Sequence, residues 1–280
     1  MGKKVKKTLM LAVLGLLLLF SLSYATNDDL QVVHYGVATG KLSEVVRFAV
    51  IADLHSCRYG SGQSELLAAV EAQEPDAVFL VGDIFDDDLP CDNAEKVVNA
   101  LAQRYPCYYV SGNHEYWSKE VDELKTIVRE AGVTILEGNS TRLEINGQLI
   151  DLCGVDDPTY IGIQTMEKQL EIAHEEMMEV RQGESDYPAI LLAHRPELIG
   201  NYLPYGYDLV LSGHAHGGQW RIPKLLNGLI APDQGLFPPY AGGRYEFGNT
   251  TMIVSRGLAR ESTWVPRVFN RPELVIVDLS

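Results

Sequence analysis

Apolar runs and amphipathic stretches alternate along most of the chain. Short runs rich in β-branched and other apolar residues have the length of buried strands, and they lie at 45–52, 77–81, 108–110, 189–193 and 209–212. Amphipathic stretches with helical spacing lie between or beside them, at 64–73, 93–104, 118–131 and about 164–181. Strands that alternate with helices in this way are typical of an α/β fold.

Part of the pattern indicates antiparallel pairing. Asn146-Gly147 separates two apolar segments, 141–145 and 148–153, and predicts a hairpin because both turn positions require a positive φ. Further strands are expected at 133–136, 251–254 and 273–278. Residues 221–248 are rich in Gly, Pro and Tyr and predict a long ordered loop near the site.

The first 25 residues differ from the rest of the chain. Residues 1–7 are basic and 8–25 are almost continuously apolar, which is the layout of a signal peptide or of an uncleaved N-terminal membrane anchor. Small residues at 23–25 favour cleavage, whereas an apolar run of about 17–20 residues is also just long enough to span a membrane. Either alternative places the domain that follows outside the cytoplasm. We expect a linker or N-terminal extension at 26–44 and one folded domain at 45–280.

Composition narrows the classes of function. With 280 residues, 46% of them hydrophobic, the chain can bury a sizeable core. Its net charge of −15 argues against nucleic acid as a partner, because binding to a phosphate backbone depends on Lys and Arg. The four cysteines are widely spaced and form no CxxC pair, which excludes a zinc finger and leaves open both disulfides and buried thiols.

Polar clusters follow the apolar runs. They are Asp53-Leu54-His55, Gly82-Asp83, Gly112-Asn113-His114-Glu115, His194 and His214-Ala215-His216. These clusters hold five of the seven histidines, and they leave out His34 and His174. The carboxyl ends of strands in an open α/β sheet are where loops converge on a ligand.

The residue types in these clusters suit a pair of metal ions. Two divalent cations about 3.5–4 Å apart need a bridging carboxylate with imidazole and carbonyl ligands on either side. The clusters supply such a set, namely Asp53, His55, Asp83, Asn113, His194, His214 and His216. An extended backbone would aim Asp53 and His55 in the same direction, and Gly82 would let the chain bend before Asp83. Asp-x-His alone is equally typical of an exposed loop, so the prediction depends on the whole set.

The order of the motifs resembles a known family. Asp-x-His, Gly-Asp-x-x-Asp, Gly-Asn-His-Glu, a lone His and Gly-His-x-His are similar to the motifs of calcineurin-like metallophosphoesterases, over about residues 45–280. The forms at 213–219 and 270–273 resemble the branch of membrane-associated or exported bacterial phosphoesterases, which includes hydrolases of lipid-linked pyrophosphates. The resemblance implies a four-layer α-β-β-α sandwich of two mixed sheets and a metallophosphoesterase catalytic domain at 45–280.

The resemblance also implies a role for each motif residue. One metal would be held by Asp53, His55 and His216, the other by Asn113, His194 and His214, with Asp83 bridging. His114 would lie beside the substrate, where it stabilises the phosphoryl group or protonates the leaving oxygen. Asp86 and Glu115 either orient ligands by hydrogen bonds or are simple solvated carboxylates. The mixed ligand shell suits Mn, Fe or Zn alike.

These roles predict a metal-dependent phosphohydrolase that cleaves a phosphodiester or pyrophosphate bond by in-line attack of a metal-activated water. The substrate would be a phosphorylated small molecule or a lipid, and the N-terminal segment favours a lipid or glycolipid at the membrane. One alternative is a broad-specificity soluble phosphodiesterase or phosphomonoesterase. Another is a non-catalytic metal-binding scaffold, against which the intact ligand set and His114 argue.

Residues that contact substrate are expected next to the metal motifs. Arg58, Tyr59 and Trp117 follow these motifs directly and are predicted to line the mouth of the site, although packing on the surface is the competing interpretation. Arg58 would bind a phosphate oxygen. The segment 236–240 is expected either to present an apolar surface to a membrane or acyl chain, or to be a packed loop.

Overall fold

The computed structural model describes residues 8, 10–11, 13, 23–181, 187–260 and 265–280. The expected export segment at 1–25 therefore lies largely outside the described residues. Within the described ranges, no helix has both the length and the apolar character needed to cross a membrane.

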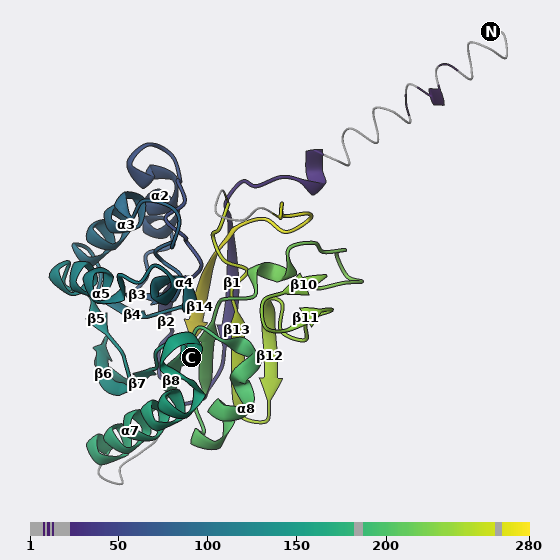
Figure 1. Ribbon diagram of the computed structural model, residues 1–280. Coiled ribbons are helices and arrows are strands. Elements are labelled where there is room, and N and C mark those ends of the chain that lie inside the picture. The colour runs from purple at the N-terminus through teal and green to yellow at the C-terminus, as the bar shows by residue number, and fades with distance from the viewer. Residues whose placement is uncertain (1–7, 9, 12, 14–22, 182–186, 261–264) are drawn as a thin grey trace.

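The first sheet is six-stranded and mixed (Figure 1). Its strands, in spatial order, are β1 (Gln31–Val37), β14 (Glu273–Leu279), β2 (Val46–Ile51), β3 (Ala77–Val81), β4 (Cys107–Val110) and β5 (Thr134–Ile135). β2 to β5 run parallel to one another, and β14 pairs antiparallel with β2 and parallel with β1.

The second sheet is also six-stranded and mixed. Its strands are β12 (Gly243–Phe247), β13 (Thr250–Val254), β9 (Leu209–Ser212), β8 (Ala189–Leu192), β7 (Gln148–Gly154) and β6 (Asn139–Ile145). The four inner strands are parallel, and β12 and β6 are antiparallel edge strands. The expected hairpin is confirmed at β6–β7, where Asn146 and Gly147 have φ values of 52° and 73°.

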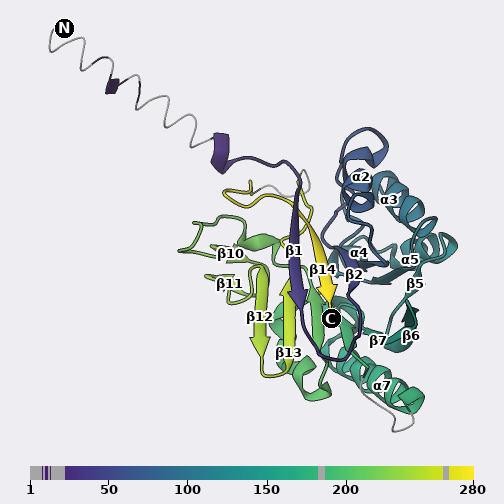
Figure 2. The same ribbon diagram turned by 180° about the vertical axis from the view of Figure 1, so that it is seen from behind.

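Three apolar cores separate the layers. Between the sheets, strand residues of both pack together, with the rings of Phe48 and Phe79 stacked 4.6 Å apart. The outer face of the first sheet is covered by α2 (Ser64–Glu71), α3 (Asp92–Ala102) and α5 (Val121–Glu130). The outer face of the second is covered by α7 (Ile163–Arg181) and α8 (Ile199–Tyr202). The expected α-β-β-α sandwich of two mixed sheets is therefore confirmed (Figures 1 and 2).

The stretch 26–44, expected to be a linker or N-terminal extension, contains a strand of the first sheet. Residues 31–37 form β1, which pairs with β14 along seven positions and lies beside it in both views (Figures 1 and 2). Val32 packs on the core beneath the helices, whereas Tyr35 and Val37 pack on the core between the sheets. β1 is a half-exposed edge strand that contains His34 and Gly36, so its apolar pattern is too weak to predict a strand.

Smaller elements complete the chain. Short helices not expected from the sequence are α4 (Asn113–Trp117) and α6 (Pro158–Ile161), with 3-10 turns η1 (Ser61–Gln63), η2 (Pro196–Leu198), η3 (Leu203–Tyr205) and η4 (His216–Gly218). The region 221–248, expected to be a loop, contains the hairpin β10 (Ile230–Ala231) and β11 (Gly235–Leu236) as well as β12. All four cysteines are free thiols. Of the two alternatives left open by the sequence, disulfides and thiols, the structure therefore has thiols.

Candidate metal centre

The predicted ligands follow the carboxyl ends of strands from both sheets. Asp53, Asp83 and Asn113 come directly after β2, β3 and β4, and the three histidines of the second half come after β8 and β9. The two groups meet, because the His214 backbone N–H donates a 2.9 Å hydrogen bond to Asp53 Oδ1. The centre therefore lies where the parallel strands of the two sheets end side by side.

The backbone at these residues is left-handed. Asp53, His55, Asp83, His214 and His216 have φ values of 49°, 48°, 52°, 65° and 46°. Such values are uncommon for residues other than glycine and cost free energy, so they persist where the surrounding structure enforces them. The extended backbone expected at Asp53 and His55 is therefore wrong. Their side chains converge because the chain turns sharply after β2.

Two glycines leave room for the converging side chains. A Cβ on Gly82, whose φ is 76°, would lie 2.4 Å from His194 Nδ1. A Cβ on Gly112 would lie 2.2 Å from Asp83 Oδ1. Both distances are far below van der Waals contact, so only glycine allows the loops after β3 and β4 to come this close.

Of the four groups of acidic and imidazole side chains that could hold a metal ion in the described part of the chain, two share one carboxylate. Asp53, His55, Asp83 and His216 each offer a ligand atom within 4.8 Å of the others, and so do Asp83, His194 and His214. Asp83 belongs to both groups, with its Oδ2 at 3.1 Å from His194 Nε2 and 3.6 Å from His55 Nε2. Asn113 is buried beside them at the start of α4.

All seven predicted ligands have a buried polar atom for which the described residues provide no hydrogen-bond partner. These atoms are Asp53 Oδ2, His55 Nε2, Asp83 Oδ2, Asn113 Oδ1, His194 Nε2, His214 Nδ1 and His216 Nδ1. Burying a polar atom without a partner is costly, so such atoms are rare unless they bind water, an ion or a ligand. The donor set of carboxylate, imidazole and amide oxygen fits divalent cations. The role of these residues as ligands stays a prediction.

Hydrogen bonds on the far side of three rings fix which nitrogen faces the centre. His55 Nδ1 lies 2.9 Å from Asp86 Oδ2, and His194 Nδ1 lies 2.9 Å from the carbonyl oxygen of Val81. His214 Nε2 lies 3.0 Å from Asp233 Oδ2. Because these oxygens accept, the bonded nitrogens carry protons, and the opposite nitrogen of each ring is the one that faces the centre and would bind a metal in place of a proton.

The charges in the centre favour a cation. Burial lowers the pKa of His194, but the carboxylates of Asp83 and Asp53 outweigh burial and raise it to about 10. Asp53 and Asp83 are themselves completely buried. Two buried carboxylates this close to an imidazole create a strongly negative potential that a proton or a metal ion would relieve.

Glu115 and Asp86 hold the ligand loops in place. The Glu115 carboxylate accepts hydrogen bonds from the backbone N–H groups of Asp83, Ile84, Phe85 and Gly112, at 2.7–3.1 Å. Asp86 orients His55 with one oxygen and accepts from two backbone N–H groups with the other. Both carboxylates are buried, so of the two alternatives left open they are orienting residues and not solvated ones.

His114 lies at the edge of the centre. Its ring is edge-on to that of His55 at 4.2 Å, and its Nδ1 lies 2.5 Å from Asp87 Oδ1. Its side chain is 21% exposed, whereas those of His55, His194 and His214 are at most 1% exposed. This imidazole is therefore accessible from solvent, as a group that meets substrate has to be.

The three residues expected at the mouth have different environments. Trp117 is 49% exposed, with its ring 4.7 Å from that of His114, and lines a cavity of about 470 Å³. Arg58 is exposed, and its Nε donates to the carbonyl oxygen of Gly60. The expectation for Tyr59 is wrong, because its ring is fully buried and its hydroxyl donates to the carbonyl oxygen of Leu258. A position just after a metal motif predicts that a residue lies near the centre, but it does not predict where the side chain of that residue points.

Sequence reasoning missed Arg195, the residue after His194. This buried guanidinium bonds Asp157 through two nitrogens, at 2.6 and 3.2 Å, and also contacts Asp233. Its Nη1 lies 3.1 Å from His214 Nε2. Only its position directly after His194 could have indicated a role for Arg195, because its partners Asp157 and Asp233 are each 38 residues away along the chain.

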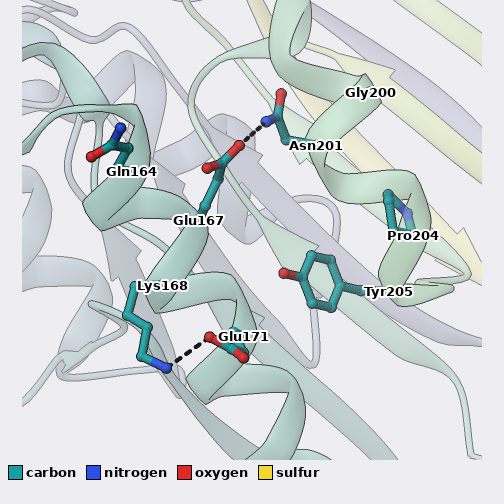
Figure 3. A pocket seen from close by; sticks show the side chains of 8 residues that line it. All are labelled: Gln164, Glu167, Lys168, Glu171, Gly200, Asn201, Pro204 and Tyr205. Carbon is teal, nitrogen blue, oxygen red and sulfur yellow. Dashed lines mark hydrogen bonds and ion pairs between the residues drawn. The ribbon is translucent and has the colours of Figure 1, made fainter.

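Another concave surface lies outside the candidate metal centre. A groove between α7 and the segment formed by α8 and η3 has a volume of about 530 Å³ (Figure 3). Four of its polar side chains form pairs, Asn201 with Glu167 and Lys168 with Glu171, each at 2.7 Å. It contains no predicted site residue, so it is not the candidate active site.

The fold and the centre together define a class, the metal-dependent phosphoester hydrolases. The model of the calcineurin-like phosphoesterase family matches residues 46–218, and the chain therefore belongs to this family. It is accordingly a hydrolase of phosphoric esters, in a family that uses divalent metal ions.

Curated relatives agree with this assignment, and a solved structure shares the fold. The chain is 28% identical to the phosphodiesterase YaeI of Escherichia coli, over 82% of this chain and 80% of that protein. It is 28% identical to the uncharacterized metallophosphoesterase Cj0846 of Campylobacter jejuni, over 97% and 69% of the two chains. The NAD nucleotidase of Haemophilus influenzae has a similar fold, with a TM-score of 0.52 and 15% identity, over 77% of this chain and only 46% of the nucleotidase.

Proposed function

We propose that this protein is a binuclear metal-dependent phosphohydrolase that cleaves a phosphodiester or pyrophosphate bond. The observation that carries the proposal is the set of seven buried, unpartnered ligand atoms that both sheets direct to one centre. Asp53, His55 and His216 would hold one cation, Asn113, His194 and His214 the other, and Asp83 would bridge them. When bound, the two cations activate a water and neutralise the charge that develops on the phosphoryl oxygens.

The chain itself supplies the positioning and the proton. Glu115 ties the loop of Asp83 to the loop of Asn113, which keeps the shared carboxylate at a fixed place between the two groups. His114 Nδ1 is held by Asp87, so His114 Nε2 is the atom that would donate a proton to the leaving oxygen or a hydrogen bond to the phosphoryl group.

Two substitutions test the proposal. Asp83→Ala and Asn113→Ala should abolish the Mn²⁺-dependent hydrolysis of bis(p-nitrophenyl) phosphate while circular dichroism shows a folded chain. Asp122→Ala, at the exposed start of α5, is the control and should keep the activity. Full activity in both site variants would exclude this mechanism and would leave the non-catalytic scaffold as the better interpretation.

We further propose that the substrate is a lipid or glycolipid presented at a membrane, with the catalytic domain outside the cytoplasm. Two observations support this. Large apolar side chains are exposed in the segment 220–237, namely those of Trp220, Ile222, Leu225, Ile230, Leu236 and Phe237. This segment lies near the first described residues of the domain, because Tyr24 shares a small cavity with Arg221 and Pro223.

Substrate comparison tests this finer proposal. The full chain with Mn²⁺ should turn over a lipid pyrophosphate or lipid phosphodiester in vesicles faster than bis(p-nitrophenyl) phosphate or p-nitrophenyl phosphate. Replacing Leu236 and Phe237 by Ser should lower only the turnover in vesicles, because these side chains are exposed and contribute no atom to the ligand set. Equal turnover of soluble diesters and monoesters by both proteins would favour the broad-specificity soluble alternative.

A further inference from the structure

A cavity of about 470 Å³ lies directly beside the proposed metal centre. It is lined by Trp117, Pro158, Thr159, Ile163, Arg195, Glu197, Leu198 and Asp233. Two of its walls touch the centre, because the Trp117 ring lies 4.7 Å from that of His114 and Asp233 Oδ2 lies 3.0 Å from His214 Nε2. A substrate whose phosphoryl group sits at the centre would therefore have one ester arm within reach of this cavity.

The charged groups of the cavity are predominantly acidic. Among the described residues that line it, Arg195 is the only guanidinium, and it pairs with Glu197 and Asp233, which also line the cavity, and with Asp157, which does not. Asp233 Oδ2 lies 3.0 Å from His214 Nε2 and also accepts from Arg195 Nη1. Arg195 is thus neutralised by its own neighbours, and the cavity repels an anion and attracts a cation.

One acceptor in this wall has no partner. Glu197 Oε2 is buried, and the described part of the chain offers it no hydrogen-bond donor, while Glu197 Oε1 lies 3.4 Å from Arg195 Nη1. A buried carboxylate oxygen that lacks a donor, on a side chain that lines a cavity, is satisfied when a ligand or a water supplies one.

The rest of the wall is apolar. Trp117 is 49% and Ile163 50% exposed, and Pro158 and Leu198 complete the lining. An indole ring beside carboxylates attracts an ammonium group by the ring quadrupole and by charge, and the aliphatic wall suits the methyl or methylene groups around it. A sugar hydroxyl would satisfy Glu197 Oε2 but would make no use of the net negative charge.

We propose that this cavity binds a positively charged ammonium group on one ester arm of a phosphodiester, while the phosphoryl group lies at the metal centre. This inference depends on the proposed function for the position of the phosphoryl group and adds the substrate class: diesters of amino alcohols, either free or as the head group of a lipid.

A pair of diesters isolates the charge. The full chain with Mn²⁺ is assayed with p-nitrophenyl phosphorylcholine and with p-nitrophenyl 3,3-dimethylbutyl phosphate, in which a carbon replaces the nitrogen and removes the charge. We expect the KM of the choline ester to be about tenfold lower. In Glu197→Gln and in Trp117→Leu the ratio of the two KM values should approach one. Glu171→Gln, the same change in the groove of Figure 3, should keep the ratio of the unaltered protein.

Binding without turnover separates this inference from the proposed function. Calorimetric titration of the Mn²⁺-loaded protein with choline should show about tenfold tighter binding than titration with 3,3-dimethylbutanol, and Glu197→Gln should remove the difference. Equal KM values for the two diesters, or equal binding of the two alcohols, would overturn the ammonium site. If neither diester is hydrolysed but choline still binds in preference, the proposed function fails and the ammonium site stands. If a lipid with a phosphorylcholine head group is turned over faster than the soluble choline ester, the natural substrate is a lipid. If the soluble ester is turned over faster, the natural substrate is a soluble diester.

Discussion

Among single residues, the groups that orient the imidazoles matter as much as the predicted ligands. Asp86 fixes the His55 ring through Nδ1, and Asp233 does the same for His214 through Nε2. A ring held in this way presents one nitrogen to the centre without losing rotational entropy when a metal binds. The Gly-Asp-x-x-Asp motif therefore contains one predicted ligand, Asp83, and also Asp86, which orients a second predicted ligand, His55.

Asp86→Ala should weaken metal binding without unfolding the protein. The His55 ring would lose the acceptor on Nδ1, and loss of such an orienting partner typically lowers metal affinity by about 10- to 100-fold. Titration of the apoprotein with Mn²⁺, followed by calorimetry or by activity, measures the shift. Asp88→Ala is the matched control, because Asp88 is an exposed carboxylate two residues further on. An unchanged affinity in Asp86→Ala would show that the hydrogen bond does not position His55.

His114→Ala should lower kcat by about 10²- to 10⁴-fold, the usual contribution of a general acid, and leave the metal content unchanged. The prediction follows from the solvent-accessible side chain of His114 and from its hydrogen bond to Asp87. Elemental analysis of the purified variant together with kcat values for a diester checks both parts. A variant that has lost its metals would instead make His114 a ligand.

Among the elements of the fold, the loop after β3 depends on a glycine. Gly82→Ala would place a Cβ 2.4 Å from His194 Nδ1, in addition to the strain of a φ of 76°. Gly147→Ala, in the β6–β7 turn, has a φ of 73° and no neighbour within 4 Å, so it experiences the backbone strain alone, about 1–2 kcal/mol. Urea denaturation should show Gly82→Ala to be the less stable variant, and metal titration should show that only this variant loses affinity. Equal behaviour of both would mean that the loop can shift away from His194.

β1 should be required for a stable fold. A chain that begins at residue 45 loses the seven-position pairing with β14 and exposes the apolar edge of Glu273–Leu279. We expect it to unfold at a lower temperature and to aggregate, compared with a chain that begins at residue 26. Thermal scans followed by circular dichroism and light scattering make the comparison. Equal melting temperatures would restore the interpretation of 26–44 as a linker.

At the scale of the whole molecule, some features of the fold and of the candidate site could be predicted from the sequence and others could not. The α/β class and the meeting of the strand ends follow from apolar runs with polar clusters after them, which are local patterns, whereas the four-layer sandwich was implied by the resemblance of the motifs to a known family. β1 was missed because an edge strand has only a weak pattern, and its identity depends on a partner more than 230 residues away. Arg195 was missed for the same reason, because its partners Asp157 and Asp233 come from other loops. Side-chain direction, as at Tyr59, is set by tertiary packing.

Metal binding should stabilise the entire fold, because the predicted ligands come from both sheets and a shared Asp83 joins the two groups. A ligand that binds only the folded state at 100 times its dissociation constant adds about 2.7 kcal/mol, which corresponds to a rise in melting temperature of roughly 5–10 °C for a chain of this size. Calorimetric scans of the EDTA-treated protein with and without Mn²⁺ measure the rise. Asp83→Ala should show little of it, whereas Glu171→Gln, in the groove away from the centre, should show all of it. A rise of equal size in Asp83→Ala would mean that the ions bind elsewhere on this acidic chain, since the shared carboxylate is the one group that both ions need.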